Sequence, residues 1–456
     1  MEAPTNVYEL VLGSPWPIAW AYRLLGLLSV LGLIVAVRDT SVNLCRPVWL
    51  LGMPLVWLGC QVVAAACTVD DELSSPTLAH FIACVICFYL GLFSLARSRN
   101  LAPFWIGLFL AFLLVLFVGW EQHFGGLEAT RQYFFKEIYP HLKEVSPEYL
   151  KKISSDRIFS TLFYPNSLAG ALLLLLPVML MLVGSARRLL TVPARCLVVG
   201  LISVGALGCL FWSGSKGGLL LMLLLALTAL MRLPFQKRLK LAILAGVLVA
   251  GLSIFFWRYI GFFQKGATSV SARFDYWEAA LKTAASKPLC GTGPGTFSIP
   301  YKAIKRPESE MTRLVHNDYL EQASDSGWIG FGAYTLFVVG SLAFGLKSAV
   351  IDVPAHVTSQ EARPQTVPSG DVSGPARPSS ETEGQAKAWW GFCIWLGAFC
   401  WALHGLFDFV LYIPALAWPA FTFLGLLLGR TRIPSTNRQV THNLKHRHEN
   451  SVPQRA

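Results

Sequence analysis

The sequence predicts an all-α membrane protein, a polytopic bundle of eleven or twelve transmembrane helices with a long, partly helical loop on one side. Of its 456 residues, 54% are hydrophobic and only 14% are charged, whereas about a quarter of the residues of a soluble globular protein are charged. The apolar residues come repeatedly in blocks of about 20, the length at which a helix crosses a bilayer. This composition excludes a soluble enzyme and a wholly disordered chain.

Eleven apolar blocks are predicted to span the membrane. They are residues 17–37, 48–67, 77–96, 101–120, 161–183, 194–212, 217–231, 239–258, 328–349, 388–406 and 410–429. The block at 217–231 is short for a hydrocarbon core of about 30 Å, so it either begins earlier or is embedded in protein. The first block is predicted to be retained, since Glu2 and Glu9 stand where a cleavable signal peptide would be basic.

The distribution of Lys and Arg predicts the orientation of the bundle. Basic residues gather after the first, third, fifth and seventh predicted spans and in the tail at 430–456. The positive-inside rule places these segments in the cytoplasm, with the N-terminus outside and the C-terminus inside. The net charge of +12 therefore indicates topology, and we expect no nucleic-acid partner. The basic tail is expected to contact anionic membrane lipids.

Polar segments divide the chain into its predicted parts. These are N-terminal helices (1–120), an outer loop (121–160), helices (161–258), a longer outer loop (259–327), one span (328–349), a disordered cytoplasmic linker (350–387), two C-terminal spans (388–429) and the basic tail (430–456). The linker is rich in Pro and Ser, a composition typical of disorder. Within the longer outer loop, residues 271–287 and 308–325 are predicted to be helical.

Ionisable residues near membrane spans are candidates for function, because each costs about 2.5–3.5 kcal/mol at the centre of a bilayer. Lys216 lies in a turn rich in Gly and Ser, where accessible backbone N–H groups and a cation would suit a phosphate. The alternative is a tight turn whose lysine reaches the membrane interface. Asp408 either faces a cavity or forms a structural ion pair.

Several chemistry-bearing motifs are missing from the sequence. The glycines at 291–295 match neither a dinucleotide fingerprint nor a P-loop, and we predict a turn between two amphipathic helices there. HExxH, a Cys/His cluster and an Asp-x-Asp pair are all absent. We therefore expect no metal and no cofactor, with any phosphate bound by Arg and Lys. Cys84 and Cys87 are predicted to pack inside a helix, and the cysteine spacing implies no disulfide framework.

Five segments, in this order, resemble the O-antigen ligase and O-antigen polymerase superfamily of bacterial membrane glycosyltransferases. They are residues 157–169, 213–217, 273–277, 291–297 and 316–327. The last is similar to the His-Asn/Ser…Gly signature, which is the most specific of the five. Two positions depart from the family pattern. Tyr164 stands where Asn is common, and Lys216 stands where Arg is frequent, which keeps the charge but loses bidentate geometry.

The resemblance implies a GT-C-like glycosyltransferase of the bacterial inner membrane, with its site facing the periplasm. The donor would be a glycan on undecaprenyl diphosphate, and the acceptor a hydroxyl of a glycan, a lipid or a protein. Arg273 and His316 are the implied catalytic residues; His316 is either a general base or a cationic phosphate ligand. The implied substrate-binding residues are Lys216, Arg157, Asn317, Asp318, Ser215, Asn166 and Asp408. Without the resemblance, Arg157, Arg273 and His316 would be interpreted as solvated loop charges.

Three functions remain open at this point. A ligase moves a finished glycan to its acceptor, whereas a polymerase of the same superfamily extends lipid-linked repeat units. A transporter of lipids or glycans is the alternative from another class. The predicted spans contain few charges and no clear pair of helices broken by Gly or Pro, which disfavours a transporter.

Overall fold

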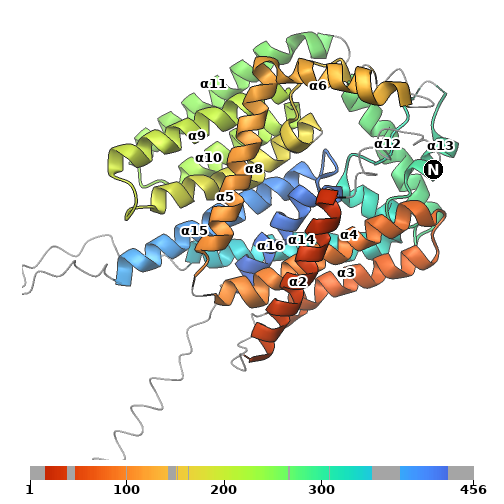
Figure 1. Cartoon of the computed structure of the whole chain (residues 1–456), viewed down its shortest axis with the longest axis horizontal. Helices are drawn as coiled ribbons and strands as arrows, with labels where there is room; N and C mark the ends of the chain where they lie inside the picture. The colour runs from red at the N-terminus through yellow and green to blue at the C-terminus, as the bar shows by residue number, and fades with distance from the viewer. Residues whose placement is uncertain are drawn as a thin grey trace, which may run out of the picture.

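The computed structural model is an all-helical bundle, and the described part of the chain contains no strand. The structure describes residues 16–38, 47–98, 100–141, 150, 153–162, 164–264, 268–307, 309–351 and 380–429. The predicted fold class is thereby confirmed (Figure 1). The basic tail at 430–456 lies outside the described residues, as does most of the predicted linker.

The α-helices differ widely in length. They are α2 (Trp16–Arg38), α3 (Val48–Ala66), α4 (Asp71–Tyr89), α5 (Ala102–Glu121), α6 (Leu127–Tyr133), α8 (Pro165–Ser185), α9 (Val192–Ser213), α10 (Lys216–Arg232), α11 (Lys237–Gln264), α12 (Thr268–Ser286), α13 (Ser298–Ile304), α14 (Asp318–Ile351), α15 (Ser380–His404) and α16 (Pro414–Gly429). Short π- or 3₁₀-helical turns include η1 (Leu90–Ser94) and η2 (Leu95–Arg97) after α4, η6 (Ser160–Leu162) before α8 and η7 (Val410–Tyr412) before α16.

Each predicted span coincides with a helix, but fewer helices are long enough to cross a membrane. Among the described residues, eight helices have the length and apolar composition of a span. They are α3, α4 with its following turns, α5 with the turns after it, α8, α9, α11, α14 and α15. The described apolar part of α2 and the whole of α16 are shorter. With 17 residues, α10 reaches about 25 Å, less than the hydrocarbon core.

Two predicted boundaries were wrong, both next to helix ends. The stretch 308–325 was predicted to be helical, yet the described residues between Lys305 and Asn317 form no helix and α14 begins only at Asp318. The cause is local, because the Asn317 side chain caps the helix by accepting from the backbone N–H of Tyr319 and Leu320, each at 3.0 Å.

The predicted linker at 350–387 is shorter than expected. Helix α14 continues to Ile351 and α15 begins at Ser380, so both ends of that range are helical. Residues 352–379 lie outside the described residues, and their predicted disorder stays a prediction.

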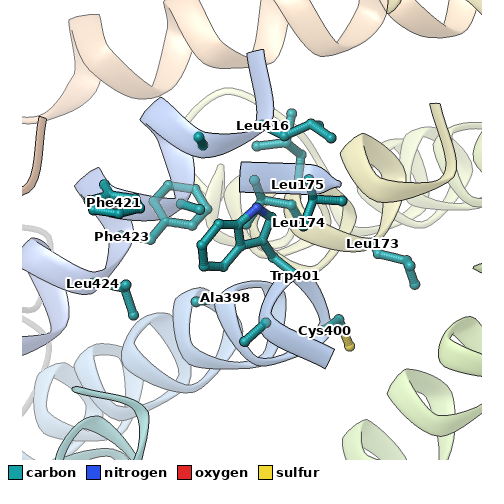
Figure 2. Packing of buried hydrophobic residues seen from close by; sticks show 14 of the residues in the cluster. Leu173, Leu174, Leu175, Ala398, Cys400, Trp401, Leu416, Phe421, Phe423 and Leu424 are labelled. Atoms are coloured by element: carbon teal, nitrogen blue, oxygen red, sulfur yellow. The ribbon is translucent and has the colours of Figure 1, made fainter. Parts of the chain in front are cut away.

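The core of the bundle is built around α8, α15 and α16. The leucine run of α8 is buried from Ala171 to Met179. Helix α8 packs against α9 and α15, and α16 packs against α4, α8 and α15. Figure 2 shows the Trp401 side chain of α15 among Leu174, Leu175 and Leu416. A Cβ on Gly397 would lie 2.1 Å from the Leu174 carbonyl oxygen, so this glycine permits the close approach of α15 to α8.

Helix α11 lies at the periphery of the bundle (Figure 1). Only Phe255 and Tyr259 of its 28 residues are buried, although its composition is that of a span. Its main neighbour is α10. Such an apolar and exposed surface is what a lipid-facing helix presents.

Candidate functional site

Asp408 lies at the centre of a polar cluster formed by segments that are distant in the sequence. It belongs to the connection between α15 and η7, and its side chain is only 5% exposed. It contacts Asn166 from the start of α8, Arg273 from α12 and His316 from the segment before α14. The structure thus brings together four of the residues that the sequence predicted for the site.

The charge of Asp408 is compensated by its neighbours. Asn166 Nδ2 donates to Oδ2 at 2.6 Å, and the Arg273 guanidinium lies 3.8 Å from the same oxygen. His316 Nδ1 lies 3.3 Å from Oδ1, which also accepts from the backbone N–H of Phe409 at 3.0 Å. Burial on its own would raise the pKa of Asp408. The hydrogen bond with His316 and the positive charge around the carboxylate outweigh burial and hold this pKa well below its usual range.

Arg157 links this cluster to the turn between α9 and α10. Its Nη2 donates to Asn166 Oδ1 and its Nε donates to the carbonyl of Ser213, both at 2.7 Å. Gly214 follows Ser213 with a φ of 61°, and a Cβ there would lie 3.2 Å from Arg157 Nε. The glycine therefore provides both the left-handed turn and the space for the guanidinium.

Ser215 and Lys216 open α10 beside that turn. Ser215 is the N-cap, and its Oγ accepts from the backbone N–H of Gly218 at 3.2 Å. The Lys216 ammonium lies 3.9 Å from the ring centre of Phe262 and 5.2 Å from that of Tyr259, both on α11. Burial, with the charges of Arg157 and Arg273 nearby, lowers the pKa of Lys216 to about 8. The positive charges of Arg157 and Arg273 therefore act on this lysine, and its phosphate-binding role stays a prediction.

Arg273 reaches the cluster from the second turn of α12. Its side chain is 23% exposed, and its Nη1 donates to the Ser269 carbonyl at 3.4 Å. Its Nε is buried and has no hydrogen-bond partner among the described residues. An arginine with an unsatisfied buried donor beside other cations has capacity left for an anionic ligand.

His316 has an unusual backbone conformation and a fixed ring. Its φ of 55° is rare for a residue other than glycine and is typical of functional or strained positions. The imidazole stacks on Tyr276 at 5.9 Å between ring centres and meets Phe409 edge-on at 4.8 Å. The side chain is 17% exposed, and its Nδ1 faces Asp408.

Asn317 and Asp318 were predicted to bind substrate, but in the structure their side chains form hydrogen bonds with backbone groups of the protein. Asn317 caps α14, as described above. Asp318 is 1% exposed, and its Oδ2 accepts from the backbone N–H of Leu411 at 2.9 Å. Its own N–H donates to the carbonyl of Gly405 at 2.7 Å. These contacts position the connection that carries Asp408, and a substrate role for the pair stays a prediction.

Helix dipoles add to the positive potential of the cluster. Helices α8, α10 and α14 begin at Pro165, Lys216 and Asp318, and Asn166, Lys216 and His316 lie at or next to these starts. The N-terminal end of a helix carries a partial positive charge and free N–H groups, which favour anions. Across the described ranges, no group of three or more His, Cys, Asp or Glu side chains is arranged to hold a metal ion.

Sequence reasoning missed the residues that support the cluster. Tyr276 and Phe409 were not singled out, although each follows a predicted site residue closely in the chain. The buried carboxylates Glu321 and Asp325 were also missed. Their spacing from Asp318, three and seven residues on, is the one signal in the sequence that places them on one face of a helix.

The middle of the chain is similar to a known protein family. Residues 201–335 match the family described as O-Antigen ligase. This range contains Lys216, Arg273 and His316, and it ends before Asp408. An 86-residue segment is 34% identical to a protein of Haemophilus influenzae described as uncharacterized. That segment covers 18% of this chain and 22% of the relative. The matched range is less than a third of the chain, and together with the all-helical membrane bundle it agrees with the resemblance to the O-antigen ligase superfamily.

Proposed function

We propose that the chain is an O-antigen ligase-like glycosyltransferase that moves a glycan from undecaprenyl diphosphate to an acceptor hydroxyl. The observation that carries the proposal is the convergence of Arg157, Lys216 and Arg273 around the Asp408–His316 pair. The family match supports chemistry of the ligase or polymerase kind in general. The donor, the acceptor and the roles of single residues are our proposal.

The three cations suit a leaving group that gains negative charge. When the bond between the anomeric carbon and the diphosphate breaks, its electron pair remains on the lipid diphosphate. Fixed cations and helix N-termini stabilise that charge more in the transition state than in the bound donor. We assign the diphosphate to Arg273 and Lys216, with Arg157 holding Asn166 and completing the positive surface. Because these groups supply the compensating charge, the reaction is proposed to need no metal.

His316 is proposed to accept the proton of the acceptor hydroxyl. Asp408 stays ionised at neutral pH and cannot donate, so Nδ1 of His316 carries the proton in their 3.3 Å contact. In its neutral form this ring keeps the lone pair on Nε2 for the hydroxyl proton. The hydroxyl oxygen attacks the anomeric carbon as the lipid diphosphate leaves. Asp408 stabilises the imidazolium that results, as a carboxylate does in other His–Asp pairs.

The proposed site faces the periplasm from the inner membrane of a bacterium. The segments that carry Arg157, Lys216, His316 and Asp408 meet one another, so they lie on one side of the bundle. The basic loops predicted to be cytoplasmic, such as the one containing Arg187, lie at the opposite helix ends.

The test is transfer by the purified full-length chain in lipid bilayers, with lipid-linked glycan isolated from cells that lack the gene. We expect His316→Asn and Arg273→Gln to lower the rate by about 10²-fold or more. Asn is chosen because it tolerates a positive φ. Lys282→Gln is the matched control on α12, since Lys282 is exposed and pairs only with Glu278 among the described residues.

Three outcomes would decide the matter. Wild-type rates in both site variants would overturn the catalytic assignment. Movement of the donor across the bilayer without a new glycosidic bond would favour a transporter. If transfer occurs, the length of the transferred glycan separates a ligase, which moves long chains, from a polymerase, which adds single repeats.

Addition of EDTA is expected to leave transfer unchanged, and a loss of activity that Mg²⁺ restores would contradict metal independence.

A further inference from the structure

The connection between α3 and α4 lies directly against the glycine-rich loop at 291–295. The backbone N–H of Val69 donates to the carbonyl of Thr292 at 2.9 Å, and Thr68 Oγ1 lies 3.4 Å from the same oxygen. A Cβ on Gly293 would lie 2.1 Å from Thr68 Oγ1. Two backbones more than 200 residues apart in the sequence are therefore in contact.

A cysteine lies at each side of this contact. Cys67 follows the last residue of α3, and Cys290 precedes the first glycine of the loop. Cys67 lies two residues before Val69 and Cys290 two residues before Thr292, so the backbone hydrogen bond between Val69 and Thr292 brings the two cysteines near each other. Cys67 is exposed and Cys290 is half-buried, so an external reagent can reach the pair. By contrast, Cys84 and Cys87 are buried inside α4.

We propose that Cys67 and Cys290 form a disulfide bond that ties the α3–α4 connection to the glycine-rich loop. The proposal rests on the orientation given under the proposed function, which places both residues in the oxidising compartment outside the membrane. A reducing cytoplasm would keep them as thiols. The cysteine spacing in the sequence gives no sign of this pair, because only the fold brings the two residues together.

The bond forms by thiol–disulfide exchange with a disulfide-bearing oxidoreductase of that compartment. The Cys67 thiolate attacks the disulfide of the oxidant and forms a mixed disulfide. The Cys290 thiolate then displaces the oxidant, which leaves with both electrons as a dithiol, and each cysteine has lost one proton. Cys67 attacks first because it is the more exposed of the two. Partial burial and the neighbouring Cys67 thiol raise the pKa of Cys290 above its usual range.

The proposed disulfide would fix a loop that the candidate site depends on. The N–H of Gly295 donates to Asp325 Oδ2 on α14 at 2.7 Å, and α14 begins two residues after His316. A covalent link at Cys290 would therefore hold one end of the loop while Asp325 holds the other. We expect reduction to loosen this loop without disrupting the core around Trp401.

The experiment is thiol labelling of the full-length chain in intact cells with a normally oxidising envelope. Free thiols are blocked with N-ethylmaleimide during denaturation, and newly reduced thiols are then tagged with a heavy maleimide. We expect two tags on the wild-type chain after reduction and none on Cys67→Ser or Cys290→Ser. Mass spectrometry of the unreduced chain should find the two peptides joined. Alkylation of both thiols before reduction, while other envelope disulfides are intact, would overturn the proposal.

A second experiment tests whether the two cysteines can pair at all, whichever side of the membrane they face. The purified chain is treated with diamide, a small oxidant, so that formation of the bond no longer depends on orientation. If the disulfide forms with diamide but not in cells, the proposal that it forms in cells is wrong. No bond in either arm means that the contact itself is wrong. Glycan transfer by Cys67→Ser is measured in parallel. Transfer by a wild-type chain that lacks the disulfide refutes this inference alone, and a wild-type chain that has the disulfide but transfers no glycan refutes only the proposed function.

Discussion

Asp408 is the residue on which the geometry of the candidate site depends. It has contacts with Asn166, Arg273 and His316, and each of these comes from a different segment of the chain. A buried carboxylate is stable only when its charge is compensated. Its three partners provide that compensation and are oriented by it in return. Loss of the carboxylate should therefore disturb both the arginine and the histidine.

We expect Asp408→Asn to lower the transfer rate by about 10²-fold or more, because His316 loses the carboxylate that sets its tautomer and Arg273 loses its ion pair. The measurement is the kcat of the purified variant with saturating donor. Glu278→Gln on α12 is the control, since Glu278 is exposed and pairs with Lys282 only, among the described residues. Equal kcat values for Asp408→Asn and wild type would show that this carboxylate is structural.

The lowered pKa of Lys216 predicts a pH dependence. Its pKa of about 8 means that the ammonium is charged below pH 8 and becomes neutral as the pH rises through that value. Donor binding to the free enzyme should weaken on the alkaline side, so kcat/KM should fall above about pH 8. In Lys216→Arg the guanidinium stays charged, and the fall should move to higher pH. An unchanged alkaline limb in that variant would exclude Lys216 as its cause.

At the scale of elements, the first turns of α14 hold three connections around the site. Asp318 accepts from Leu411 N–H, Glu321 accepts from Val315 N–H, and Asp325 accepts from Gly295 N–H. The three carboxylates are buried and lie three and four residues apart. This helix face therefore aligns the connection with Asp408, the segment with His316 and the glycine-rich loop.

We expect Asp325→Ala to destabilise the chain by a few kcal/mol, because it leaves two buried donors, Gly295 N–H and Tyr412 OH, without their acceptor. The measurement is thermal unfolding of the purified chain in one detergent. Glu278→Ala, a surface change, should shift stability by less than about 0.5 kcal/mol. If Asp325→Ala has the same melting temperature as the control, the carboxylates of α14 do not hold the neighbouring connections in place.

The sequence predicted helices well and their ends less well. Long apolar blocks such as 161–183 gave helices at nearly the predicted positions, because hydrophobic length is a strong local signal. The start of α14 was misplaced, because its polar first turns looked like part of one longer amphipathic helix. Partners far away in the sequence satisfy those polar residues, and no local pattern contains that information.

At the scale of the whole molecule, the orientation of the bundle can be tested directly. In a chain whose accessible native cysteines are replaced by serine, we place a cysteine at Lys282 or at Arg187. Both positions are exposed. A membrane-impermeant maleimide should label Lys282→Cys in cells with a permeable outer membrane. It should label Arg187→Cys only after the inner membrane is opened. The reverse pattern would invert the bundle and move the site to the cytoplasm.

The candidate site was predictable residue by residue but not as an arrangement. Motif resemblance indicated Arg157, Lys216, Arg273 and His316, each within its own short segment. The hydrogen bond between Asn166 and Asp408 joins residues 242 positions apart, and only the folded bundle shows it. The same holds for the aromatic rings around His316. Local sequence motifs indicated which kinds of side chain belong to the site. Tertiary packing determines which of these side chains contact one another.

The peripheral position of α11 has a consequence for how the membrane itself takes part. Tyr259 and Phe262 of this helix flank the Lys216 ammonium, yet the helix contacts mainly α10, and most of its apolar surface is exposed. A bilayer thicker or thinner than the helix would tilt it at small energetic cost and carry both rings along. The acyl-chain length of the surrounding lipids would then tune the charge of Lys216, making bilayer thickness a regulator of the proposed transferase.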